Sequence, residues 1–292
     1  MQNYCLATDS TADLPFELIQ EFDIKVIPLS YEVEGSMRQE CFDQNRKIEL
    51  KKFYERIRNG EKIKTSQINP TEFVDFFSPI LANGQDILYI AFSSALSGTY
   101  GSAKIALDEL KKKFPERKIF VVDSLSASLG EGLIVYETAL KKRTGISIEK
   151  LTQWIEDNKL KICHWFILDD LNHLKSGGRI STMTAFFGSI LNVKPLLNVD
   201  DNGCLVIKGK HRGKRKSLEL FVKNMKNSAI LPVDNFFVTH SQCQEDAEFI
   251  ADKVKSEFGT KKIVINEIGS VIGSHTGIGT VAIFFRGNKR DR

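Results

Sequence analysis

Cysteine is scarce in this sequence, and no two cysteines stand at the spacing of a redox or zinc motif. The 292 residues include five cysteines, an odd number, spread widely along the chain. This pattern argues against a disulfide framework and a zinc site, and it favours a reducing compartment. The first residues show no basic stretch followed by an apolar one, and no apolar run approaches the roughly 18 residues of a membrane span. We therefore expect a cytoplasmic protein that is neither secreted nor membrane-spanning.

Common catalytic motifs are missing as well. The sequence has neither GxxxxGK[ST] nor HExxH, and residues 1–160 contain no histidine, which excludes a Ser–His–Asp triad wholly within that part of the chain. The net charge of +4 is too small to imply nucleic acid by itself. We therefore expect a protein without a metal or a cofactor, and the overall charge gives no support to a nucleic-acid partner.

Apolar strands alternate with amphipathic helices in the first half of the chain. Near-continuous apolar strands of this kind are typical of a parallel sheet covered by helices on both faces. The second half combines further strands and helices with a predicted β-hairpin around "DDNG" at 200–203. A chain of 292 residues is long enough for two domains. We expect an α/β fold with a parallel-sheet domain over 1–160 and an α+β domain with a mixed sheet over 161–292.

Turn and capping residues predict several element boundaries. Asn69 before Pro70 predicts the start of a helix. The stretches "KTSQINP" (64–70) and "SVIGSHTGIG" (270–279) are read as loops. The charged tail "RGNKRDR" (286–292) is expected to fray.

Hydroxyl-bearing residues gather where predicted strands of the parallel sheet end. In open α/β sheets, ligands bind outside the carboxyl ends of the strands. Ser97 and Thr99 flank Gly98 just before a predicted helix, where free backbone N–H groups and the helix dipole suit an anion. Each residue alone can be an ordinary helix cap, but the set predicts a site for a small charged or polar head group. The strand ends carry Thr8, Asp9, Ser10, Thr11, Ser93, Ser94, Asp123 and Ser124.

Phenylalanine dominates the aromatic residues, with twenty against two tryptophans. Such a surplus is typical of a Phe-rich core, and it can also line an apolar tunnel. The stretches "TEFVDFF" (71–77) and "TAFFGSIL" (184–191) are candidates for such a lining, with an ordinary core as the alternative.

Seven stretches together resemble the DegV family of fatty-acid-binding proteins. They are "TDSTADLP" (8–15), "KTSQINP" (64–70), "SSALSGTYGSA" (93–103), "VDSLSASLGEG" (122–132), "LKSGGRIS" (174–181), "ILNVKPLL" (190–197) and "IGSVIGSHTGIGTVAIFF" (268–285). They occur in the family's order and span nearly the whole chain. The sequence departs from the family at Ile68, where proline is common, and in extra bulk and charge near residue 212.

The resemblance implies a long-chain fatty acid buried between the two domains. It implies that hydroxyls of Thr65 and Ser97 hold the carboxylate, with His275 close by and Ser94 and Arg179 as further neighbours. It implies no catalytic residue. In bacterial members the bound acid is presented to a fatty-acid kinase, which forms an acyl phosphate for phospholipid synthesis, and transient membrane contact is compatible with this role.

Two other readings remain open at this point. A serine esterase or thioesterase could use Ser97 with His275, although His275 could equally be a solvated loop histidine. The run "KGKHRGKRK" (208–216) holds seven basic residues among nine when His211 is counted. It could be a solvated face, a nucleic-acid contact without aromatic interleaving, or a docking site in which Arg212 pairs with a carboxylate of the kinase.

Overall fold

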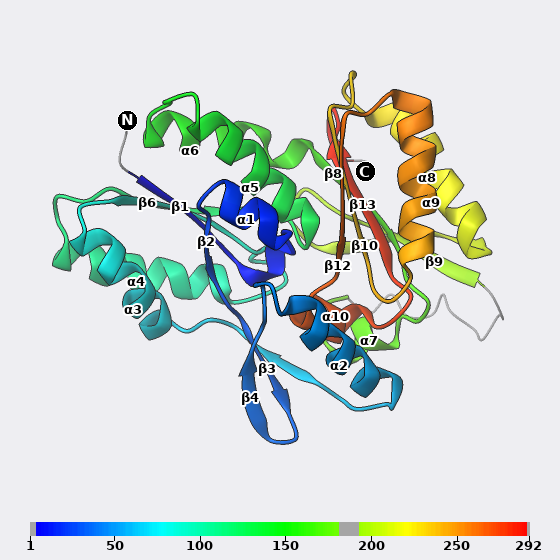
Figure 1. The fold of residues 1–292 in the computed structure, drawn as a ribbon, viewed down its shortest axis with the longest axis horizontal. Coiled ribbons are helices and arrows are strands. Elements are labelled where there is room, and N and C mark those ends of the chain that lie inside the picture. The colour runs from blue at the N-terminus through cyan, green and yellow to red at the C-terminus, as the bar shows by residue number, and fades with distance from the viewer. Residues whose placement is uncertain (1–3, 181–192, 291–292) are drawn as a thin grey trace.

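The computed structural model describes residues 4–180 and 193–290, which form two large β-sheets and one small sheet (Figure 1). The first sheet is parallel throughout, with the strand order β2-β1-β6-β7. Its strands are β1 (Tyr4–Asp9), β2 (Lys25–Ile27), β6 (Asp86–Ala91) and β7 (Ile119–Asp123).

Helices cover both faces of this sheet, which explains why its strands are almost uninterruptedly apolar. One face packs against α1 (Phe16–Glu21), α5 (Leu129–Lys142) and α6 (Ile148–Asn158), and the other against α3 (Pro70–Ala82) and α4 (Thr99–Lys113). The predicted cap of α3 is confirmed, because the Asn69 side chain accepts a hydrogen bond from the Glu72 backbone N–H and the Glu72 carboxylate accepts one from the Asn69 N–H.

The second sheet is mixed, with the order β10-β9-β8-β13-β11-β12, and only β11 and β12 pair in parallel. Its strands are β8 (Ile162–Ile167), β9 (Val193–Val199), β10 (Leu205–Arg212), β11 (Asn235–His240), β12 (Lys262–Glu267) and β13 (Val281–Arg286). The hairpin predicted around 200–203 joins β9 to β10. Helices α8 (Lys214–Ser228) and α9 (Gln244–Phe258) cover one face.

The predicted α/β architecture with one parallel and one mixed sheet is therefore confirmed. The division at residue 160 stays a prediction. The two large sheets lie on either side of that position in the sequence, but one hydrophobic cluster joins α5 to the inner face of the second sheet through Phe237, Ala282 and Phe284. Of the helices in the described ranges, none is long and apolar enough to cross a membrane.

A small antiparallel sheet was not anticipated. It consists of β3 (Ser30–Val33), β4 (Ser36–Gln39) and β5 (Lys64–Ser66), and it packs against α2 (Arg46–Arg58). We call these four elements the α2 lobe. Pro28 ends β2, and the chain then leaves the parallel sheet for this lobe.

Both loop predictions were wrong in part. Residues 64–66 of the first stretch form β5, and residues 270–276 of the second form the short helix α10 (Ser270–Thr276). A polar strand of three residues shows no alternation, and a helix of two turns that contains Gly273 has weak intrinsic propensity. Contacts with distant parts of the chain therefore decide both structures.

The phenylalanines of 71–77 belong to the core. Phe73 and Phe77 pack against Tyr89 with ring centroids 5.2 and 5.7 Å away. The ordinary-core alternative thus holds for this stretch. The second candidate lining, 184–191, lies outside the described residues.

The expectation that the C-terminal tail frays was wrong for Arg290, which is 1% exposed. Its guanidinium donates hydrogen bonds to the carbonyl oxygens of Asp200 (2.7 Å) and Ile162 (3.1 Å) and to the Ser126 hydroxyl (2.8 Å). Burial lowers the pKa of Arg290 to about 10. The planar donor fork reaches three segments that converge only in the folded chain, so this role is invisible in the local sequence.

We predict that Arg290→Ala lowers the free energy of unfolding by about 2–4 kcal/mol, because it leaves buried acceptors without a donor and opens a void. Lys289→Ala is the matched control, since the neighbouring side chain is exposed. Urea denaturation of both variants measures the difference. Equal midpoints would show that the buried guanidinium contributes nothing.

Candidate functional site

A cavity of about 570 Å³ lies between the inner face of the second sheet and the loops that follow β6 and β7. Its volume falls within the roughly 300–1,000 Å³ typical of small-molecule pockets. The walls come from segments far apart in the chain, including β5, the start of α4, β8, β11, α10 and β13. The fold therefore builds this space from nearly all of its parts.

The body of the cavity is apolar. Phe166 on β8 and Ala282 and Phe284 on β13 form one wall, and Phe92 and Leu96 face them from the loop after β6. Side chains alternate between the two faces of a strand, so His164 and Phe166 face the cavity while Trp165 and Ile167 pack under α8 and α9. The strands thus supply a core face and a cavity face at once.

One part of the wall is polar and brings together two of the predicted residues. Thr65 on β5 and His275 in the last turn of α10 are hydrogen-bonded, with 2.8 Å between Thr65 Oγ1 and His275 Nε2. Ser66 and Gln67 line the cavity beside them. Strand β5 and the residue that follows it thus bring consecutive polar residues to the cavity lining.

Ser97 lines the cavity at the start of α4. Its hydroxyl lies 2.9 Å from Thr99 Oγ1 and accepts a weaker hydrogen bond from the Thr99 backbone N–H at 3.3 Å. Backbone N–H groups in the first turn of a helix lack intrahelical acceptors, and the helix dipole makes this end of α4 favourable for an anion. A hydroxyl with rotational freedom can turn toward such a ligand.

His275 is neutral at ordinary pH. Burial, with the charges of Arg179 and His173, lowers the pKa of His275 to about 4. A Cβ atom at Gly177 would clash with Nδ1 of His275, so the ring packs directly on the backbone of α7 (Asn172–Ser176) and its cap. This close approach requires glycine at position 177.

Arg179 also lines the cavity. Its Nε donates a hydrogen bond to the Leu96 carbonyl oxygen at 3.1 Å and its Nη1 donates to the Gly177 carbonyl oxygen. These contacts hold a positive charge near Ser97 and His275 while part of the guanidinium binds backbone. The arrangement attracts an anion without a full bidentate clamp.

Ser94 does not share this position. Its side chain is exposed and stays outside the lining, while its backbone N–H donates to Asp123 Oδ1 at 3.2 Å. The strand-end residues before it also differ from expectation. Asp9 is buried and accepts hydrogen bonds from Thr11, the Tyr89 hydroxyl and the Phe92 N–H. These groups build the scaffold that supports the loop rather than the cavity wall.

The geometry does not form a hydrolytic dyad. Ser97 is hydrogen-bonded to Thr99, and His275 is hydrogen-bonded to Thr65 instead. A serine nucleophile needs its base within hydrogen-bond reach, and that base needs an orienting partner. In the part of the chain that the structure describes, no group of three His, Cys, Asp or Glu side chains could hold a metal ion.

Sequence reasoning missed the deeper wall of the cavity. His164 and Thr239 line it but carry no local signal of a site, and Ser128 lies in the stretch 122–132 that resembles the family but was not predicted as a site residue. Neither ring nitrogen of His164 makes a hydrogen bond of good geometry, although the Ile162 carbonyl is near, and burial lowers its pKa well below the ordinary value. Period-two alternation along β8 would have identified His164 and Phe166 as sharing a face, but only the fold shows what that face meets.

Comparisons with known proteins agree over the whole chain. A family profile described as "Uncharacterised protein, DegV family" matches residues 5–288. A DegV domain-containing protein of Clostridium perfringens is 42% identical over 292 residues, which is 100% of each chain.

Solved structures share the fold. A fatty-acid-binding DegV family protein of Thermus thermophilus superposes with a TM-score of 0.86 at 29% identity, covering 98% of this chain and 100% of the other. DegV of Bacillus subtilis, a fatty acid binding protein, gives 0.82 at 28% identity, covering 99% and 100%. This chain therefore belongs to the DegV family.

Proposed function

We propose that this protein binds a long-chain fatty acid in the cavity and acts as a carrier. The observation that carries the proposal is a single space with an apolar body and a polar wall formed by Thr65, Ser97, Arg179 and His275. An amphiphile with one anionic end fits such a surface. The fatty acids named for the family's solved structures have this chemistry.

Burial of the acyl chain of the fatty acid is the main source of affinity in this proposal. Each CH₂ group removed from water contributes about 0.8 kcal/mol, so a sixteen-carbon chain could supply on the order of 10 kcal/mol. Phe92, Phe166 and Phe284 offer the apolar surface for it. The head group then needs orientation more than strong binding.

We call the polar wall formed by Thr65, Ser97, Arg179 and His275 the head-group end of the cavity. Its neutral groups suit a carboxylate that must stay reactive. Hydroxyls and an uncharged imidazole can orient the oxygens by hydrogen bonds without neutralising them. In the proposed reaction, a carboxylate oxygen attacks the terminal phosphorus of a nucleoside triphosphate held by the kinase partner, the nucleoside diphosphate leaves, and an acyl phosphate forms for phospholipid synthesis. We propose this presentation as the role of the carrier. It would work in the cytoplasm, with membrane contact that is transient.

We predict that Thr65→Val and Ser97→Ala each weaken retention of oleate by about tenfold or more, because losing one hydrogen bond to a charged group costs about 1.5–3 kcal/mol. Ser94→Ala, on the same loop but outside the cavity, is the matched control. Mass spectrometry of the denatured purified protein and fluorescence titration with fatty acid give the occupancy and the affinity.

Equal affinities for all three variants would refute the assignment of the head-group end. The esterase alternative has its own signature in the same set of proteins. A hydrolase would turn over a chromogenic ester, and Ser97→Ala would abolish that turnover. A carrier shows no such turnover and yields a free fatty acid on denaturation.

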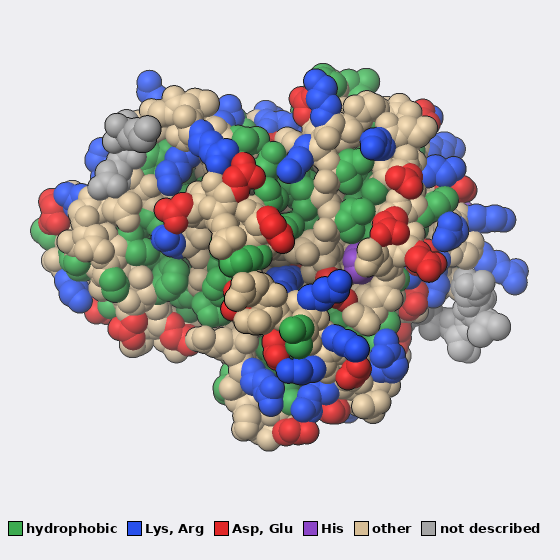
Figure 2. Space-filling model, viewed as in Figure 1, with side chains coloured by type: hydrophobic (Ala, Val, Ile, Leu, Met, Phe, Trp, Pro, Cys, Tyr) green, Lys and Arg blue, Asp and Glu red, His purple; other side chains and the backbone are tan. Residues whose placement is uncertain are grey.

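Docking of the kinase is proposed at the basic run 208–216. The run comprises the end of β10 and the start of α8, and Arg212 is exposed at the last position of the strand. Figure 2 shows Lys and Arg side chains projecting from the right-hand edge of the molecule, where α8, α9 and β9 lie in Figure 1. Lys214 is less available, because it pairs with Asp246 at 3.1 Å.

Arg212→Ala should leave the lipid content unchanged but raise the carrier concentration that gives half-maximal activity of the organism's fatty-acid kinase. The defect should shrink as salt rises, since salt screens the attraction that the wild type has. Arg58→Ala, an exposed arginine at the end of α2, is the control. Superimposable titration curves for wild type and Arg212→Ala at low salt would leave Arg212 as solvated surface.

A further inference from the structure

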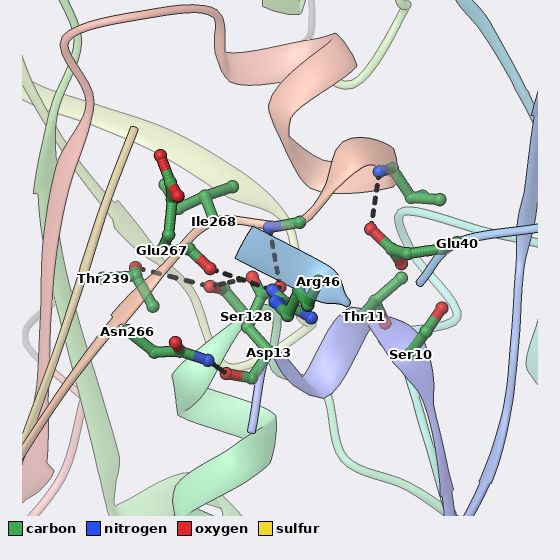
Figure 3. Close-up of polar contacts among 12 residues, drawn as sticks. Ser10, Thr11, Asp13, Glu40, Arg46, Ser128, Thr239, Asn266, Glu267 and Ile268 are labelled. Atoms are coloured by element: carbon green, nitrogen blue, oxygen red, sulfur yellow. Dashed lines mark hydrogen bonds and ion pairs between the residues drawn. The ribbon is translucent and has the colours of Figure 1, made fainter. Parts of the chain in front are cut away.

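A buried charged cluster lies where the α2 lobe meets the segment that leads into α10 (Figure 3). Asp13 Oδ1 accepts hydrogen bonds from Arg46 Nη2 at 2.6 Å and from the Gly269 N–H at 2.8 Å. Glu40, just after β4, accepts one from the Val271 N–H at 2.9 Å. The two carboxyl groups therefore accept hydrogen bonds from backbone N–H groups at the start of α10 and fix its first turn.

Two backbone carbonyl groups of the segment 267–271 also accept hydrogen bonds from side chains of α2. Arg46 donates to the Glu267 carbonyl oxygen at 2.9 Å, and the Tyr54 hydroxyl donates to the Ile268 carbonyl oxygen at 2.8 Å. A Cβ atom at Gly269 would clash with the Glu40 carboxylate, so glycine permits the close approach. The α2 lobe thus fixes this segment through side chains, not through a shared sheet.

This segment and α10 form part of the cavity wall. Ile268, Val271 and Ile272 line the cavity, and His275 follows in the last turn of the same helix. A short helix moves as a unit, so a shift of its first turn moves the apolar wall and the ring that bonds Thr65. The position of the head-group end is therefore coupled to Glu40.

The cluster is only partly satisfied. Glu40 Oε2 makes no hydrogen bond of good geometry among the described residues, although the Ser10 hydroxyl is near, and the Nε and Nη1 atoms of Arg46 are buried without a partner there. Around Glu40 stand Asp13 and the Ser10 hydroxyl, Arg46 and Tyr54 from α2, and Tyr31 from β3. With both carboxyl groups ionised, two negative charges share one guanidinium in the interior, an arrangement that burial makes costly.

We propose that Glu40 is a positioning residue for the head-group end: its carboxyl group fixes the first turn of α10 and so sets His275 against Thr65, and loss of the Glu40 proton loosens this wall of the cavity. The proposal rests on the fatty-acid-binding function proposed above. It gives the α2 lobe, which contributes only β5 and its continuation to the cavity, a role in controlling how long a ligand is held.

The direction of the pH effect follows from the charges. Burial, and next the Asp13 carboxylate, raise the pKa of Glu40 to about 7. When α10 moves away and water reaches the carboxyl group, its pKa returns to the ordinary value near ~4.3. The held state therefore keeps a proton that the loosened state gives up. Rising pH favours the loosened state by at most about tenfold per pH unit, up to the pKa of the held state, and has little further effect above it.

The test uses the full-length protein loaded with oleate. Stopped flow measures the release of oleate to albumin between the two pKa values of Glu40, from ~4.3 to about 7. Wild type should release oleate faster as pH rises, by about tenfold or more between the two ends. Glu40→Gln, which stays neutral and keeps an acceptor for the Val271 N–H, should release slowly at every pH. Glu40→Ala, which lacks the acceptor, should release fast at every pH. Glu55→Gln, an exposed acid on α2, should follow wild type.

The ring of His275, followed by NMR, gives a readout that does not depend on ligand. The pKa of His275 should rise from about 4 toward the ordinary value in Glu40→Ala, and it should stay at about 4 in Glu40→Gln. A Glu40→Gln variant that keeps the wild-type pH dependence of release overturns the proposal. So does a Glu40→Ala variant with unchanged His275 titration. If Glu40→Ala does not fold, the isosteric Glu40→Gln decides through its pH profile. Failure of oleate to bind would instead reject the proposed function. The His275 titration would still test whether Glu40 positions α10.

Discussion

The ion pair between Asp13 and Arg46 is the contact on which the arrangement of the cavity depends (Figure 3). Its two side chains are 0% and 8% exposed, so the pair is shielded from water. Breaking a buried pair by removing one partner typically costs about 3–5 kcal/mol, because an uncompensated charge remains inside. The same carboxylate binds the Ser128 hydroxyl and the Gly269 N–H. One interaction thus joins the start of α5, the α2 lobe and the wall that leads into α10.

The head-group end follows a different physical rule. Interior charges in the cluster around Asp13 fix the framework, whereas Thr65, Ser97 and neutral His275 offer weak, adjustable hydrogen bonds to the cavity. Among the described residues that line the cavity, Arg179 alone brings a full charge, and backbone carbonyls accept hydrogen bonds from part of its guanidinium. On the proposed function, the buried ion pair keeps the framework rigid, while the neutral hydrogen-bonding groups orient an anionic ligand and leave it accessible.

The regular part of the fold was predictable because its signals are local. Continuous apolar runs identified the strands of the parallel sheet, and Asn69 with Pro70 identified a helix start. The small elements were not predictable, since β5 and α10 are fixed by side chains far away in the sequence. The hydroxyl pattern at the strand ends pointed to Ser97, and the family resemblance gave Thr65, Ser97, Arg179 and His275 their roles. Only the structure shows that these four line one cavity while Ser94 does not. Arg290 was misread because charge alone gives no hint of three converging acceptors.

The cavity also explains why the protein needs two sheets of different kinds. The parallel sheet is buried on both faces and gives a rigid base whose loops carry Ser97 and Ser128. The mixed sheet has one face packed under α8 and α9 and leaves the other partly open toward that base. On the proposed function, an acyl chain completes this inner face with apolar surface that the side chains do not supply. Binding and folding stability are then linked, because a ligand that binds only the folded chain stabilises it in proportion to its affinity and concentration.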